Sequence, residues 1–110
     1  MYNYGGSAMR LISFDNNQDR TFTGRVYFTS YSWDATRSPQ LVSGDFNGDL
    51  KSDIGTIYNY GGSIMGVLIY ENHNYNSFVA SRFFTRSAWD ATRSPRLVQG
   101  DFNNDNLDDL

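Results

Sequence analysis

The stretch that decides the fold is DFNGDLKSDIGTIYNYGGSIMGVLIYE, which runs from Asp45 to Glu71. It begins with an acidic loop and continues into Asp53–Tyr60, a segment rich in residues that favour strands. A Gly-Gly pair that starts at Gly61 follows, and glycine is the residue that tight hairpin turns require. Ile64–Glu71 then predicts another strand. We therefore expect this stretch to fold as a loop that leads into a β-hairpin.

Two parts of this stretch, and one segment outside it, occur twice in the chain of 110 residues. YNYGGS starts at Tyr2 and Tyr58, WDATRSP starts at Trp33 and Trp89, and GDFN contains Asp45 and Asp101, so that each pair is 56 positions apart. A fixed period without insertions is the signature of a repeat architecture. The sequence thus predicts two copies of one unit, residues 1–54 and residues 55–110, that together form one structural unit.

Periodicity predicts four short strands in a complete repeat. After the hairpin, Phe78–Arg86 is expected to form a third strand and Arg96–Phe102 a short fourth one. The composition agrees, because 16% aromatic residues and 10 glycines against 2 prolines favour strands and turns over helices. We therefore predict an all-β fold of two four-stranded β-propeller blades. A β-sandwich of about eight strands, built by duplication, is the alternative.

Oxygen-bearing side chains recur at positions 1, 3, 5 and 9 of two acidic loops. Ca²⁺ binds six to eight oxygen atoms, and a tight loop with alternate polar side chains and a backbone carbonyl supplies them. The predicted ligands are Asp45, Asn47, Asp49 and Asp53 with the carbonyl of Lys51, and Asp101, Asn103, Asp105 and Asp109 with the carbonyl of Leu107. A solvated acidic turn is the alternative. The pattern favours one structural calcium ion per repeat.

Loop position 6 differs between the two copies, with Leu50 in the first loop and Asn106 in the second. Calcium loops of this kind usually place glycine there, because the sharp turn needs a left-handed backbone. Asparagine tolerates that conformation, whereas leucine costs roughly 1–2 kcal/mol. We therefore expect the first loop to be the weaker site or to have a relaxed turn.

On these residues the chain resembles the FG-GAP (VCBS-type) repeats of integrin-like β-propellers, which read as a strand, GDFNGD, a further acid and another strand. Its Tyr-Gly-Gly and Trp-rich segments are similar to fungal and bacterial propeller lectins that bind N-acetylglucosamine-type sugars. The resemblance implies a ring of blades, bound Ca²⁺, a carbohydrate ligand and an extracellular or secreted location.

Two blades do not close a ring, because their sheets would keep exposed edges. The chain opens at Met1, late in a strand that is complete in the second repeat, and it stops at Leu110, where the same strand begins. The two ends are therefore expected to meet between neighbouring copies in a homo-oligomeric ring, either a trimer or a tetramer. A piece excised from a larger propeller is the alternative.

The WDATRSP and YNYGG segments supply the candidate sugar-binding residues. An aromatic ring can stack on a pyranose, while carboxylate, amide and guanidinium groups fix its polar substituents. The candidates are Trp33, Asp34, Arg37, Trp89, Asp90 and Arg93 from the loops, and Tyr2, Asn3, Tyr4, Tyr58, Asn59 and Tyr60 from the facing strands. The alternative is structural, with tryptophan as inter-blade core and Asp with Arg as a pair that fixes the loop.

Several functions are disfavoured by composition. A net charge of −3 argues against nucleic acid as a partner, no apolar run approaches the length needed for membrane insertion, and the N-terminus shows no signal peptide. His73 is the single histidine, cysteine is absent, and only Asp34 and Asp90 repeat as carboxylates outside the acidic loops. We therefore expect no enzyme. A multivalent lectin is the first hypothesis, and a calcium-stabilised protein-binding or purely structural propeller is the second.

Overall fold

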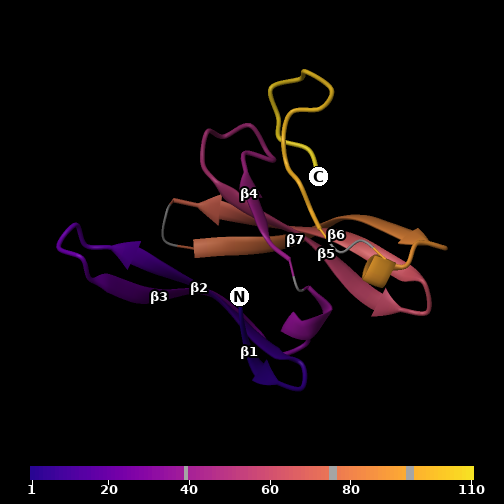
Figure 1. Cartoon of the computed structure of the whole chain (residues 1–110), viewed down its shortest axis with the longest axis horizontal. Coiled ribbons are helices and arrows are strands. Elements are labelled where there is room, and N and C mark those ends of the chain that lie inside the picture. Colours follow the sequence, from indigo (N-terminus) through magenta and orange to yellow (C-terminus); the bar gives the residue numbers. More distant parts are fainter. Residues whose placement is uncertain (39, 75–76, 94–95) are drawn as a thin grey trace. The chain divides into compact units, whose positions relative to one another are not determined.

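The computed structural model describes residues 1–38, 40–74, 77–93 and 96–110 (Figure 1). Within these residues the fold is all-β, with two antiparallel sheets and two short 3₁₀ turns, and no α-helix is present. The chain divides into two compact units, Met1–Thr36 and Arg37–Leu110. Pro39 and Pro95, the prolines of the two WDATRSP segments, lie outside the described residues.

The first unit contains a three-stranded sheet with the order β1-β2-β3. Its strands are β1 (Tyr2–Gly5), β2 (Ala8–Asn16) and β3 (Phe22–Ser30). Alternation along β2 buries Met9 and Leu11, as expected when one face of a strand packs on a core. Phe14, further along the same strand, is 70% exposed. Along β2, the buried residues are therefore confined to the first half of the strand.

The second unit contains a four-stranded sheet with the order β4-β5-β6-β7. Its strands are β4 (Val42–Gly44), β5 (Asp53–Gly61), β6 (Ile64–His73) and β7 (Ser77–Ser87). The three strands predicted at 53–60, 64–71 and 78–86 are thus confirmed. Met65, Leu68, Ile69 and Tyr70 are buried on β6. Because successive residues of a strand point to opposite faces, β6 is buried on both faces and forms the core of this unit.

The Tyr-Asn-Tyr-Gly-Gly segments form the same hairpin in both units. Gly5 and Gly61 adopt positive φ angles of 90° and 85°, and the next glycine of each turn has a φ of 58°. The side chain of Asn3 accepts a hydrogen bond from the backbone N–H of Gly5 at 2.7 Å, and Asn59 accepts one from Gly61 at 2.8 Å. Left-handed glycines and a capping asparagine are what such turns require. The hairpin therefore gives this segment a structural reason to recur.

The fourth strand predicted at Arg96–Phe102 does not form. Among residues 96–110 the pairing is a single antiparallel bridge between Gly100 and Asp109, whereas the equivalent Val42–Gly44 pairs with β5 over three residues. This bridge is the counterpart of the Gly44–Asp53 pair, which is one of the three pairs in the first ladder. The second acidic loop is therefore held by one bridge where the first is held by a ladder.

Candidate functional site

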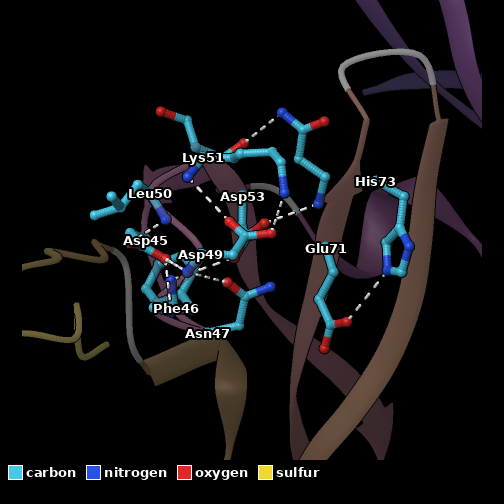
Figure 2. A network of polar contacts seen from close by, with 12 residues as sticks. Asp45, Phe46, Asn47, Asp49, Leu50, Lys51, Asp53, Glu71 and His73 are labelled. Atoms are coloured by element: carbon cyan, nitrogen blue, oxygen red, sulfur yellow. Dashed lines mark hydrogen bonds and ion pairs between the residues drawn. The ribbon is translucent and has the colours of Figure 1, made fainter.

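The carboxylate of Asp45 organises the first acidic loop, as Figure 2 shows. Its Oδ1 atom accepts hydrogen bonds from the backbone N–H groups of Gly48 at 2.7 Å and Asp49 at 3.1 Å. Its Oδ2 atom accepts one from Leu50 at 2.9 Å. A carboxylate that receives several N–H donors holds a turn firmly. Loop position 1 therefore fixes the path of positions 4 to 6.

The second acidic loop repeats this pattern atom for atom at several positions. Asp101 accepts hydrogen bonds from the N–H groups of Asp105 at 3.0 Å and Asn106 at 2.9 Å. In both loops the position-3 asparagine accepts a hydrogen bond from the position-5 N–H, at 3.0 Å in each case. Desolvation acts to raise the pKa of Asp101, but the surrounding backbone N–H groups together hold it below the ordinary value. The two loops are therefore the same turn.

The backbone at loop position 6 is left-handed in both copies. Leu50 has a φ of 62° and Asn106 a φ of 67°. The prediction of a relaxed turn in the first loop is therefore wrong. Leu50 adopts the conformation that asparagine or glycine adopts more easily, and its side chain is 91% exposed, so packing offers no compensation. The left-handed backbone of Leu50 therefore costs roughly 1–2 kcal/mol.

Asp53, at loop position 9, is fully buried at the start of β5. Its carboxylate accepts hydrogen bonds from the N–H groups of Phe46 at 3.3 Å and Asn72 at 2.8 Å. Desolvation raises the pKa of Asp53, and the charges of Asp49 and Asp45 raise it further. The carboxylates of one loop therefore repel one another, which is the condition that a cation relieves.

Its counterpart Asp109 accepts a hydrogen bond from the N–H of Phe102 at 3.0 Å. Position 9 thus ties the end of each loop back to its second residue.

Lys51 distinguishes the first loop from the second. Its ammonium group forms an ion pair with Asp49, and this contact lowers the pKa of the Asp49 carboxyl. Leu107 occupies the equivalent place in the second loop and carries no charge, so Asp105 has no such partner. Within the described parts of the chain, no group of three or more His, Cys, Asp or Glu side chains is gathered so as to hold a metal ion.

The two acidic loops contact each other through Asp108. Its carboxylate accepts a hydrogen bond from the N–H of Asp45 at 2.7 Å, and its own N–H donates to the carbonyl of Asp45 at 2.9 Å. A Cβ atom on Gly44 would lie 2.6 Å from Oδ2 of Asp108, so glycine is needed at this contact. Sequence reasoning missed Asp108 because the first repeat has Ser52 at that position.

The aspartates of the WDATR segments close two identical turns. Oδ1 of Asp34 accepts hydrogen bonds from the N–H and hydroxyl of Thr36 at 2.9 and 2.7 Å. Asp90 accepts the same pair from Thr92 at 3.0 and 2.6 Å. The Thr92 hydroxyl, followed by its N–H, lowers the pKa of Asp90. These bonds start the 3₁₀ turns η1 (Ala35–Arg37) and η2 (Ala91–Arg93).

Trp33 lies beside a phenylalanine of β3, and Trp89 lies beside the equivalent phenylalanine of β7. The ring centroids of Phe28 and Trp33 are 6.0 Å apart, and those of Phe84 and Trp89 are 6.3 Å apart. Arg86 lies 5.7 Å from the Trp89 ring, within cation–π range. Trp89 is nevertheless 53% exposed. The two tryptophans therefore make equivalent contacts with a phenylalanine, and about half of Trp89 remains exposed to solvent.

Arg37 brings part of the predicted sugar-binding set together within the second unit. Its Nη1 atom donates to the backbone carbonyls of Asn59 at 3.3 Å and Tyr60 at 3.2 Å. The Tyr58 and Tyr60 rings contact each other at a tilt of 58°, with centroids 4.8 Å apart, and Arg82 lies 6.0 Å from the centroid of the Tyr60 ring. Four candidate residues therefore lie at the Gly61-Gly62 hairpin.

Burial separates the two tyrosines of this group. Tyr58 is 6% exposed and belongs to the core, whereas Tyr60 is partly exposed. Gly66 lies under the Tyr60 ring, because a Cβ atom there would come within 2.8 Å of its Cε2. Of the two tyrosines, Tyr60 is thus the one whose ring is more exposed to solvent.

The remaining candidates lie in other parts of the chain. Trp33, Asp34, Tyr2 and Asn3 belong to the first unit, and the side chain of Tyr4 lies outside the described part of the structure. Arg93 in η2 has its Nε 3.9 Å from the Asp90 carboxylate. Arg82, which sequence reasoning missed, joins the group from β7; its position in the first repeat is Val26, so repetition gave no signal.

Comparison with protein-family models, with curated proteins and with solved structures gives no match. No helix of the described residues is long and apolar enough to cross a membrane.

Proposed function

We propose that the chain is a carbohydrate-binding module, built as two blades of a calcium-stabilised β-propeller. The observation that carries this proposal is the group at the second hairpin, where Arg82 lies over the partly exposed Tyr60 ring and Arg37 donates to the Tyr60 backbone carbonyl. A partly exposed aromatic face beside forked N–H donors suits a pyranose, because the ring stacks and the donors orient hydroxyl or acetamido groups. An N-acetylglucosamine-type sugar is the proposed ligand.

Calcium is proposed as a structural ion, one per acidic loop. Its ligands would be Asp45, Asn47, Asp49, the carbonyl of Lys51 and Asp53 in the first loop, and Asp101, Asn103, Asp105, the carbonyl of Leu107 and Asp109 in the second. The residues fit hard-cation chemistry, since all the donors are oxygen atoms. Support comes from the raised pKa of Asp53 and from the matching hydrogen bonds of the two loops.

The propeller and its assembly belong to the same proposal. The sheets of the two units repeat one hairpin and one connecting turn, which supports blades of a common design. We propose that copies of the chain complete the ring as a trimer or tetramer, in an extracellular or secreted setting as the resemblance to propeller lectins implies. Several weak sites on one ring would then bind a multivalent surface by avidity.

A calcium-stabilised scaffold that binds protein, or serves structure alone, is the second candidate. It is favoured by the hydrogen bonds of Asp34, Asp90 and Arg37, which hold turns and backbone carbonyls. On this account the WDATR segment recurs for structural reasons alone. Both candidates are binding proteins, and we propose no catalytic role.

Isothermal titration with N-acetylglucosamine in calcium separates the two candidates. Tyr60→Ala is expected to weaken binding about tenfold, since ring stacking contributes on the order of 1 kcal/mol. Tyr31→Ala is the matched control, because Tyr31 is 78% exposed and lies in the other unit. A folded, calcium-loaded protein that takes up no sugar would reject the lectin and leave the scaffold.

A further inference from the structure

We infer that Arg93 joins one copy of this chain to the next, by donating to the backbone carbonyls of Asn3 and Tyr4 in a second copy. The inference rests on the assembly proposed above and names the contact that makes it. Its basis is a junction that the chain already contains once, between Arg37 and the hairpin of β5 and β6.

The internal junction is the template. Arg37 follows the Asp34–Thr36 turn, and its Nη1 donates to the carbonyls of Asn59 and Tyr60 at 3.3 and 3.2 Å. These carbonyls belong to the YNYGG segment of the repeat that follows. Two hydrogen bonds from a charged donor to backbone carbonyls are specific and stronger than neutral ones. In the internal junction, the arginine of one repeat therefore holds the hairpin of the next.

Arg93 is the counterpart of Arg37 in the second repeat, and no hydrogen bond from its side chain to a hairpin carbonyl is seen among the described residues. It follows the Asp90–Thr92 turn, whose two hydrogen bonds match those of the first copy, so its backbone starts from the same geometry. Its side chain is 87% exposed, and its polar contact among the described residues is the approach of Nε to Asp90 at 3.9 Å. That distance is too long for a hydrogen bond, and an exposed ion pair contributes little.

Asn3 and Tyr4 occupy the same places in the first hairpin as Asn59 and Tyr60 in the second. The hairpin of β1 and β2 has the register shift between Asn3 and Gly5 that the second hairpin has between Asn59 and Gly61. The asparagine side chain caps the turn at 2.7 Å in one hairpin and 2.8 Å in the other. The two carbonyls that follow Tyr2 are therefore held in the geometry that Arg37 recognises.

The same contact can repeat from copy to copy. Each chain would offer Arg93 at one site and the β1–β2 hairpin at another, so the contact is of the head-to-tail kind. Such contacts close into rings when the rotation allows.

Native mass spectrometry of the full chain in calcium, across a dilution series, tests the inference. Arg93→Ala is expected to weaken assembly by about tenfold or more, with unchanged circular dichroism because the side chain is exposed. Arg93→Lys is expected to restore assembly only in part, since ammonium lacks the forked geometry. Arg25→Ala, which removes an exposed pair with Asp15, is the control and should assemble like the parent.

The outcomes are distinct. An Arg93→Ala protein that assembles as tightly as the parent would overturn the Arg93 contact and leave the ring proposal standing. A parent chain that stays monomeric at every concentration would overturn both. Sugar affinity is read separately, at the Tyr60 hairpin inside one chain, so failure of the lectin proposal does not affect this test.

Discussion

The two acidic loops have the same hydrogen-bonded turn but different residues at four positions. Asp45 and Asp101 hold their loops through equivalent N–H donors. The differences are Gly48 against Asn104, Leu50 against Asn106, Lys51 against Leu107, and Ser52 against Asp108. Alternate Asp and Asn side chains therefore suffice to fix the turn, whereas the variable positions set its strain, its local charge and its contact with the other loop.

The two sheets show a similar contrast. β6 is central in a four-stranded sheet and buries Leu68 and Tyr70 completely. β2 is central in a three-stranded sheet, and Phe14, the counterpart of Tyr70, is 70% exposed. Repeated sequence thus produces repeated local structure, while burial depends on what surrounds each copy.

The largest expected difference is in the cores. Leu68→Ala should lower the free energy of unfolding by about 2–5 kcal/mol, because it removes a fully buried side chain and leaves a cavity. Ile12→Ala, the equivalent change in β2, should cost less, since Ile12 is only half-buried. Urea unfolding of both variants measures this, and equal losses would show that the first sheet is packed as tightly as the second.

The close contact between Gly66 and the Tyr60 ring offers a sharper comparison. Gly66→Ala should destabilise by about 1–3 kcal/mol, because its Cβ would lie 2.8 Å from the Tyr60 ring and 3.1 Å from the Phe84 carbonyl. Gly24→Ala is the control, since its Cβ would meet Phe14 at an ordinary 3.5 Å. Thermal unfolding that ranks these two variants in the opposite order would contradict the described packing under Tyr60.

Position 6 of the loops predicts a gain in stability. Leu50→Gly should raise the free energy of unfolding by about 1 kcal/mol, because glycine adopts the left-handed φ of 62° without the steric cost. Asn106→Gly should change it by only a few tenths of a kcal/mol, since asparagine already tolerates this conformation. Chemical denaturation without calcium is the measurement. If the Leu50→Gly protein is no more stable than its parent, the left-handed backbone of Leu50 is not strained.

The smallest effect concerns pH. The pKa of Asp90 is lowered in the folded state by the Thr92 hydroxyl and N–H, so its stabilising effect is present above the ordinary Asp pKa of 3.8 and is lost as pH falls through the lowered value. Thr92→Val should raise the Asp90 pKa toward the ordinary value, as followed by carboxyl carbon NMR. The Asp34 resonance is the internal control, and an Asp90 pKa that does not move would rule out the Thr92 turn.

The sequence predicted local structure well because local rules determine it. Strands β5, β6 and β7 were located within a few residues, since Gly-Gly and Asn-rich turns bound them. The left-handed position of Leu50 followed from its place in the loop, although relaxation of the turn did not occur. The repeat also identified Asp34 and Asp90, which turned out to close turns.

Contacts between distant segments were beyond such rules. Arg37 reaches carbonyls more than twenty residues away, Arg82 approaches Tyr60 from another strand, and Asp108 has no acidic counterpart in the first repeat. The strand predicted at Arg96–Phe102 failed for a related reason, because strand formation depends on a partner and Asp109 supplies a single bridge. Pairing, unlike a turn, cannot be inferred from one segment alone.

The two repeats build one turn twice, with a strained residue in the first, and the central proposal is that this turn binds a cation. Calorimetric titration of Ca²⁺ into the metal-free chain tests it most directly. The account predicts two ions per chain, the first loop binding more weakly, and Leu50→Gly bringing the two affinities closer together. No uptake, or a single ion per chain that Leu50→Gly leaves unchanged, would contradict it.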